Sequence, residues 1–404
     1  MKVLVISHGH PKFSAGGGEV AAYSMYSALK DAGHDANFLA WNNNANAGEM
    51  GRSIEQITAT EWLISTKTEH FTFSSLNEEA INAFKIMLES LKPDVVHFHH
   101  LIHLGVELPR LVKSIVKNVK VFLTLHEYLF ICANNGQMIT TKGELCYGAS
   151  PSACSQCFPK ITPESFFMRE GYIKNCLASV DHFFSPSEFL RERYIQWGLP
   201  EQRITHLENI LDLDVATNKK VKPELIKEFG FFGQINYYKG LDILLDAFAI
   251  MKKTAPEARL HINGHMSEIN SPEYRKLLEQ KIQDLGNSVV LNGPYTKETL
   301  KARMDQVGWL VMSSRWWENS PVVIQEAWAN KVPIIVPNIG GMLEGAKLQD
   351  GGVVYEARNT ESLAKELAES SKMKVPQYTT LAKELPKYSD KKLFAKLIEL
   401  YKKI

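Results

Sequence analysis

Short apolar runs alternate along the chain with longer stretches in which apolar residues recur at every third or fourth position. The runs at residues 2–7, 36–40 and 121–126 are bounded by polar residues, as expected for parallel strands that are buried on both faces of a sheet. The stretches at residues 78–94 and 163–180 have helical spacing. Strands that alternate with helices predict doubly wound parallel sheets, which is an α/β fold.

The alternation continues through a second half of the chain, after an irregular crossover. With 404 residues, the chain is long enough for two domains that each bury a core of their own. We therefore predict a Rossmann-like N-terminal domain over residues 1–210 and a second Rossmann-like domain over residues 211–385. A terminal helix with one apolar face is predicted over residues 386–404.

Composition and charge narrow the function classes. The net charge of +1 gives no global attraction to nucleic acid or to acidic lipid. No stretch approaches the ~20 apolar residues that a membrane-spanning helix needs. The first residues, MKVLVIS, are typical of a strand rather than of a signal peptide. We therefore expect a cytoplasmic protein whose cysteines are reduced.

One basic segment leaves a peripheral contact with the inner face of a membrane open. Its cations are interspersed with apolar residues, as in an amphipathic surface helix. A helix that packs on the sheet and has a solvated outer face is the favoured interpretation. The basic residues are Arg110, Lys113, Lys117 and Lys120.

The stretch at residues 313–341 carries the strongest chemical signal. A buried strand leads into a loop with Glu318, and Pro321 fits the first position of the helix that contains Glu326. In open α/β sheets, ligands bind at the carboxyl ends of strands. Carboxylates there accept hydrogen bonds from sugar hydroxyls, and the start of a helix binds phosphate. The residues at this helix start are Asn319, Ser320, Pro321 and Val322.

Other loops at predicted strand ends are suited to a nucleotide. Glycines allow a backbone to approach a phosphate closely, and a lysine before a helix suits a diphosphate. Each signal is weak alone. The glycines are Gly16, Gly17 and Gly18, placed just before a helix, and Gly233, Gly264 and Gly293; the lysine is Lys239.

The spacing Glu318-x7-Glu326, followed by Gly340-Gly341-x-x-Glu344, resembles the signature of the family 4 retaining glycosyltransferases. The resemblance covers nearly the whole chain. It implies the GT-B architecture, in which two Rossmann-like domains face a cleft, the C-terminal domain holds the donor and the terminal helix crosses back to the N-terminal domain.

The resemblance also implies roles for residues. Catalytic roles fall to Glu318 and His126 at the donor sugar and to Lys239 at the diphosphate. Glu326 contacts the ribose of the nucleotide. Further donor contacts are Gly17, Gly18, Gly233, Gln234, Gly264, Tyr295, Asn319, Ser320, Pro321 and Val322. Gln234 stands where the family has an arginine that holds the diphosphate, so one positive charge is missing. Either Arg315 or the loop of Gly16, Gly17 and Gly18 compensates, or donor affinity is weaker.

The function implied is retaining transfer of a hexose-type sugar from a nucleotide diphosphate sugar, with a UDP-sugar favoured. The acceptor would be a glycan or a lipid-linked oligosaccharide in surface polysaccharide biosynthesis. Catalysis would need no metal, because positive groups of the protein stabilise the diphosphate. Two alternatives remain: a nucleotide-sugar epimerase of the same fold, and a non-catalytic nucleotide-sugar-binding module.

Cysteine spacing predicts a separate structural feature. Four cysteines fall within the irregular segment 132–157, in the pattern C-x13-C-x7-C-x2-C. Such a set in a reduced compartment favours a structural zinc ion over free thiols, and disulfides are least favoured. These residues are Cys132, Cys146, Cys154 and Cys157. The histidines at 97, 99, 100 and 103 lack the other ligands of a metal site at short range, so strand-end packing is the favoured interpretation there.

Overall fold

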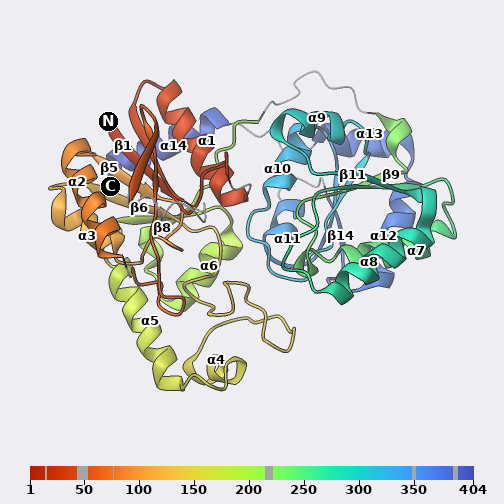
Figure 1. Cartoon of the computed structure of the whole chain (residues 1–404). Coiled ribbons are helices and arrows are strands. Elements are labelled where there is room, and N and C mark those ends of the chain that lie inside the picture. Colours follow the sequence, from red (N-terminus) through yellow and green to blue (C-terminus); the bar gives the residue numbers. More distant parts are fainter. Residues whose placement is uncertain (14–15, 43–52, 76, 214–221, 348–351, 385–389) are drawn as a thin grey trace. The chain divides into compact units, whose positions relative to one another are not determined.

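The structure is a computed structural model that describes residues 1–13, 16–42, 53–75, 77–213, 222–347, 352–384 and 390–404. Contacts divide the chain into two compact units (Figure 1). Unit 1 comprises Met1–Asp212 and Ser389–Ile404, and unit 2 comprises Leu213–Tyr388.

Unit 1 is built on an eight-stranded sheet with the strand order β3-β4-β2-β1-β5-β6-β7-β8. All neighbouring strands are parallel except β3, which is antiparallel to β4. The strands are β1 (Lys2–Ser7), β2 (Asp35–Trp41), β3 (Ile54–Thr58), β4 (Glu61–Ile64), β5 (Val95–Phe98), β6 (Lys120–Thr124), β7 (His182–Ser185) and β8 (Ile204–His206).

The helices of unit 1 connect these strands, and the last one comes from the end of the chain. They are α1 (Gly17–Asp31), α2 (Glu78–Leu91), α3 (Leu108–Ile115), α4 (Pro151–Cys157), α5 (Pro163–Leu177), α6 (Glu188–Trp197), the short 3-10 turn η1 (Glu201–Arg203) and α14 (Asp390–Lys403). Helix α14 shares a core with α1 and β1, through Leu397 and Tyr401. The hydroxyl of Tyr401 lies 2.5 Å from Nδ1 of His97, so α14 is also joined to β5 by a buried polar contact.

Unit 2 has a six-stranded parallel sheet with the order β11-β10-β9-β12-β13-β14. Its strands are β9 (Glu228–Phe232), β10 (Arg259–Asn263), β11 (Val289–Gly293), β12 (Trp309–Val311), β13 (Ile334–Pro337) and β14 (Gly352–Tyr355). Its helices are α7 (Leu241–Lys252), α8 (Pro272–Leu285), α9 (Lys297–Met304), α10 (Val322–Ala329), α11 (Gly340–Lys347), α12 (Thr360–Ser371) and α13 (Val375–Glu384), with 3-10 turns η2 (Pro223–Leu225), η3 (Tyr237–Lys239) and η4 (Gly286–Ser288).

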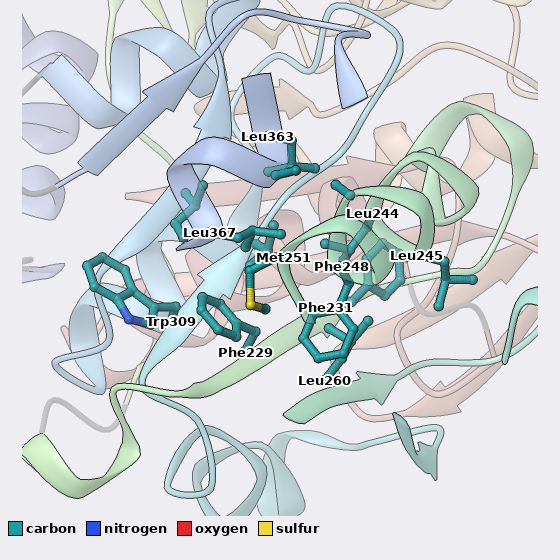
Figure 2. Close-up of a cluster of buried hydrophobic side chains, with 14 of the residues drawn as sticks. Phe229, Phe231, Leu244, Leu245, Phe248, Met251, Leu260, Trp309, Leu363 and Leu367 are labelled. Carbon is teal, nitrogen blue, oxygen red and sulfur yellow. The ribbon is translucent and has the colours of Figure 1, made fainter. Parts of the chain in front are cut away.

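The core of unit 2 lies between its sheet and a layer formed by α7 and α12. Figure 2 shows aromatic and aliphatic side chains from both helices meeting those of β9, β10 and β12. Trp309, Phe229 and Phe248 are fully buried there, and the indole N–H of Trp309 donates to the carbonyl of Ile226. The apolar runs predicted as strands therefore supply one side of the core, as parallel strands should.

The predicted fold class is confirmed, since both units are α/β with parallel sheets. The segment 55–76, whose sequence pattern is ambiguous, contains β3 and β4 in an antiparallel pair. Helix α8 has helical apolar spacing, with Leu278 buried and with Tyr274, Ile282 and Leu285 packed against the core.

The basic segment 110–120 is used in internal contacts. Lys113 forms an ion pair with Asp181 at 2.5 Å, Arg110 donates to the carbonyl of Asn175, and Lys120 donates to the carbonyl of Ile404. Val112 is buried. These contacts favour the helix packed on the sheet over a membrane-facing surface. Among the described residues, no helix has the length and apolar character needed to cross a membrane.

We predict that Phe248→Ala lowers the free energy of unfolding by ~3–5 kcal/mol, because it leaves a cavity in the α7 layer. Ile250→Ala on the same helix is the matched control, since its side chain is 40% exposed, and should change stability by less than ~0.5 kcal/mol. Urea denaturation followed by circular dichroism measures both. Equal losses would show that the α7 layer does not carry the stability of this unit.

Candidate functional site

Each sheet has one point where the strand order reverses, and this is where open α/β sheets bind ligands. In unit 2 the reversal lies between β9 and β12, and in unit 1 it lies between β1 and β5. The loops that leave the carboxyl ends of these strands carry most of the residues predicted to act on the donor. The topology therefore selects the same positions that the sequence motifs select.

In unit 2 an ion pair bridges the reversal point. Lys239, in the loop after β9, places Nζ 2.5 Å from Oε1 of Glu318, in the loop after β12. Oε1 also accepts hydrogen bonds from Oγ of Ser314 at 2.8 Å and from the indole N–H of Trp316 at 3.0 Å. Oε2 of Glu318 accepts no hydrogen bond from a described residue. The carboxylate is therefore rigidly held by one oxygen while the other can accept a hydroxyl.

Around this pair, backbones pack so closely that only glycine fits at two positions, one after β13 and one next to Lys239 in the loop after β9. A Cβ on Gly341 would overlap the carbonyl oxygen of Asn319, and one on Gly240 would overlap the carbonyl oxygen of Ser313. Gly240 also has a φ of +65°, which favours glycine. The N–H of Gly341 donates to the carbonyl of Glu318 at 2.8 Å. The Gly340-Gly341 pair thus packs against the backbone of the Glu318 loop and holds it in place.

Glu326 lies in the second turn of α10 and is near Tyr295, whose pKa is raised by burial and by the Glu326 carboxylate. Burial raises the pKa of Glu326 itself to about 7. The Tyr295 ring meets that of Phe232, at the end of β9, edge-on with 5.6 Å between centroids. A carboxylate beside an aromatic pair is suited to a nucleoside, because the ribose needs an acceptor and the base needs a flat apolar contact.

The glycines at the strand ends differ in whether close packing or a positive φ requires glycine. Gly264 packs on the backbone of Gly233, whose carbonyl oxygen a Cβ on Gly264 would overlap. Gly233 and Gly293 have φ values of +135° and +70°, and a Cβ on either would meet nothing within 4 Å. Gln234, beside Gly233, is exposed. Space for a ligand therefore adjoins Gly233 and Gln234, whereas Gly264 serves internal packing.

The helix start after Glu318 differs by one residue from the prediction. Pro321 precedes the first helical residue, Val322, and does not occupy the first helical position itself. Asn319 is buried, while Ser320, Pro321 and Val322 are partly exposed. The amide end of α10 thus remains accessible beside Glu318, where its dipole favours an anion.

In unit 1 the corresponding region is lined by histidines. His126 follows β6, and its Nε2 lies 3.0 Å from Nδ1 of His99, with the two rings stacked. Burial holds the pKa of both imidazoles well below the usual range, so both are neutral at pH 7. His99 also stacks on His97, which fits the prediction of strand-end packing for these residues.

The glycines at the start of α1 meet this histidine group. A Cβ on Gly18 would come within 3.2 Å of the His8 ring and 3.6 Å of the His126 ring. Gly17 and Gly18 are the first two residues of α1, so the prediction that they precede the helix is wrong. A helix can begin with glycine here because the first N–H groups need no intrahelical partner.

Sequence reasoning missed Glu127. Its Oε1 lies 2.9 Å from Nε2 of His100, and its Oε2 accepts the N–H of Leu129. Nδ1 of His100 accepts the N–H of Ile102, so the ring proton is on Nε2. Nε2 therefore donates a hydrogen bond to Oε1 of Glu127. Burial raises the pKa of Glu127 to about 8. Its position directly after His126, at a strand end, is the signal that could have identified it.

The predicted site residues thus form two groups, one in each unit. Lys239, Glu318 and Glu326 belong to unit 2, with the donor-binding loops, and His126 belongs to unit 1 with Gly17 and Gly18. His8, His100 and Glu127 join the group in unit 1.

The four cysteines of segment 132–157 are free thiols. The pKa of Cys132 is raised to about 11, mainly by burial and to a smaller extent by the nearby Cys146 and Cys154. Within the residues that the structure describes, no three His, Cys, Asp or Glu side chains are grouped closely enough to hold one metal ion. The thiols are therefore neighbours without the ligand geometry of zinc, and the zinc ion stays a prediction.

Metal analysis of protein purified without chelator tests this prediction. One zinc ion per chain, lost together with thermal stability in Cys154→Ser, would support it, because a structural zinc stabilises the loop that binds it. Cys176→Ser is the control, since this buried cysteine lies outside the set. Protein that contains no zinc and has four titratable thiols in the segment would refute it.

Two doubly wound units with polar residues at their reversal points are typical of nucleotide-binding α/β proteins. Comparison with family models is more specific. Residues 15–215 match the model "Glycosyltransferase Family 4", and residues 214–391 match "Glycosyl transferases group 1". The chain belongs to this family of glycosyltransferases.

Relatives and solved structures agree with this assignment. A glycosyltransferase of Haemophilus influenzae is 23% identical over 88% of this chain and 86% of its own length. Mannosylfructose-phosphate synthase of Agrobacterium fabrum is 28% identical over 29% of this chain, so the chain spans less than a third of that relative, 28% of its length. The crystal structure of Anabaena HepE in complex with UDP has a TM-score of 0.71 at 16% identity, with 100% of both chains covered. The fold is therefore GT-B.

Proposed function

We propose that this protein transfers a hexose-type sugar from a nucleotide diphosphate sugar to a glycan or lipid-linked acceptor, with retention of the anomeric configuration. The observation that carries the proposal is the Lys239–Glu318 pair at the reversal point of unit 2. It combines, at one place, a cation for a diphosphate and a held carboxylate for a sugar.

The nucleoside would bind at Glu326 and Tyr295. The Glu326 carboxyl group is close to Tyr295 and receives no hydrogen bond from a described side chain, so it can accept the ribose hydroxyls. We favour uracil as the base because the similar HepE structures hold UDP and UDP-glucose.

The diphosphate would bind at Lys239 and at the amide end of α10. Negative charge develops on the leaving diphosphate as the sugar departs, and preorganised positive groups stabilise it most where water is excluded. Gln234 supplies no charge at this place. Lys239 therefore carries most of the electrostatic work, and no catalytic metal is required by the proposal.

The sugar would be oriented by Oε2 of Glu318 and by the neutral His126. Retaining hydrolases place two carboxylates ~5–5.5 Å apart around the anomeric carbon. Here Glu318 and Glu326 are assigned to sugar and ribose hydroxyls, so we favour a front-face displacement, in which a donor phosphate oxygen takes the proton of the acceptor hydroxyl.

A nucleotide-sugar-binding module is the second candidate, and the exposed Gln234 is the observation that favours it. An epimerase of the same fold would release altered sugar without an acceptor. Release of UDP that depends on an added acceptor separates transfer from both alternatives.

We predict that UDP stabilises the protein selectively in a thermal-shift screen against UDP, GDP, ADP and dTDP. A ligand at a hundred times its Kd stabilises by ~2.7 kcal/mol. Glu326→Ala should abolish this shift, while Glu366→Ala, an unrelated glutamate on α12, should retain it. A full shift in Glu326→Ala would exclude the proposed ribose contact.

UDP affinity should also depend on pH. The pKa of Glu326 is raised to about 7, so below pH 7 the carboxyl group is protonated and accepts ribose hydroxyls poorly. The Kd should therefore be ~10-fold higher at pH 6 than at pH 8, which is the ratio that one required deprotonation with this pKa gives. Isothermal titration calorimetry checks this, and Glu326→Gln should bind weakly and with no such dependence.

Restoring the missing charge should strengthen donor binding. Gln234→Arg places a guanidinium beside the open space at Gly233, and a charge-assisted hydrogen bond contributes ~1.5–3 kcal/mol, or about 10-fold or more in Kd for UDP. Gln283→Arg on α8 adds the same charge at an exposed position as a control. Equal effects in both variants would mean that only the net charge matters.

A further inference from the structure

Arg315 is a charged residue of the site region that the proposed mechanism does not use. Its guanidinium forms a two-point ion pair with Asp242, in the first turn of α7, and Nη1 also donates to the carbonyl of Tyr237 at 2.8 Å. The guanidinium lies over the Tyr237 ring, 4.3 Å from its centroid. Both charged side chains are nearly buried, with 13% and 12% of their surface exposed.

The backbone of Arg315 is held as well. Its N–H donates to the carbonyl of Tyr238 at 2.8 Å, and its own carbonyl accepts two hydrogen bonds from Arg358. Arg315 lies in the loop after β12, whereas Tyr237 and Tyr238 lie in the loop after β9. The residue thus ties together the two loops that flank the reversal point.

Lys239 directly follows the two tyrosines that Arg315 holds. Its carbonyl accepts Oγ of Ser313, and its Nζ reaches Glu318 at 2.5 Å. Four hydrogen bonds therefore join the two loops, and Arg315 donates two of them. The charge of Arg315 is neutralised by Asp242, which also accepts the hydroxyl of Tyr274 at 2.7 Å. Such an arginine is poorly placed to substitute for the missing diphosphate arginine, because both of its terminal nitrogens already donate to Asp242.

We propose that Arg315 is a positioning residue for the diphosphate subsite. Through Asp242 and the carbonyl of Tyr237 it holds η3, and thereby places the Lys239 ammonium where it meets Glu318. This inference rests on the proposed function, in which Lys239 binds the diphosphate of the donor. It explains how one lysine can act in a site that lacks the family's arginine: its position is fixed by a second cation that does not touch the ligand.

The test compares UDP with uridine, which lacks the diphosphate, by calorimetry and by displacement. Arg315→Lys keeps the charge but cannot make the two-point contact. Asp242→Asn keeps Arg315 and removes the negative charge that pairs with it. Each variant should raise the Kd for UDP by about 10-fold and change that for uridine by less than about 2-fold. The double variant should bind UDP no more weakly than either single variant, because both substitutions break the same Arg315–Asp242 ion pair.

Arg191→Lys is the matched control, since it makes the same change at the ion pair with Glu201 in unit 1. It should bind UDP like the wild type. If Arg315 touched the diphosphate directly, Asp242→Asn would leave UDP binding unchanged or tighten it, and this result would overturn the inference. Equal weakening for UDP and uridine would also overturn it, by showing a general loss of structure.

Failure of the proposed function gives a different result. In that case the wild type would bind neither UDP nor any other nucleoside diphosphate of the screen, before any variant is compared. Selective binding by the wild type, with unchanged affinity in Arg315→Lys, would overturn the positioning role alone.

Discussion

The candidate site of unit 2 depends on how one buried carboxylate is paired and held in place. Glu318 is only 6% exposed, and burying a charge is costly unless it is paired and hydrogen-bonded. Lys239, Ser314 and Trp316 all donate to the same oxygen, so the second oxygen keeps its capacity to accept. The carboxylate is thus held in place by one oxygen while the other oxygen stays available to a hydrogen-bond donor. The price is that Lys239 must share its charge between this carboxylate and any diphosphate that arrives.

Contacts between backbones fix the positions of these loops and therefore of the side chains that the loops carry. Gly240, Gly264 and Gly341 each lie against a carbonyl oxygen of a neighbouring loop, where any Cβ would overlap it. The loops after β9, β10, β12 and β13 are therefore fixed to one another at their backbones. Close packing of this kind makes the site rigid, which favours preorganised electrostatic stabilisation over adjustment on binding.

The strands and the Glu318–Glu326 pair could be predicted from the sequence because their signals are local: apolar runs bounded by polar residues, and a helix start between two carboxylates. Contacts between distant residues could not. Arg315 and Asp242 are 73 positions apart, and His100 and Glu127 are joined only because β5 and β6 pair in the sheet. From the sequence, Arg315 is one of the groups that could compensate for the missing arginine, whereas in the structure its guanidinium is paired with Asp242. Whether a charge is available to a ligand is decided by its tertiary partner, and the order of residues does not contain that information.

The electrostatic character of the two reversal points differs for a physical reason. In unit 1 burial lowers the pKa of His8, His99 and His126, so these imidazoles offer hydrogen bonds without positive charge. In unit 2 Lys239 is paired with the Glu318 carboxylate, Arg315 is neutralised by Asp242, and Arg358 donates to the carbonyl of Arg315. In the proposed function, a diphosphate would be attracted by Lys239 and by the dipole of α10, whose effect falls off within about one turn. The strength of donor binding would then depend on how accurately η3 places Lys239, because Gln234 provides no second positive charge.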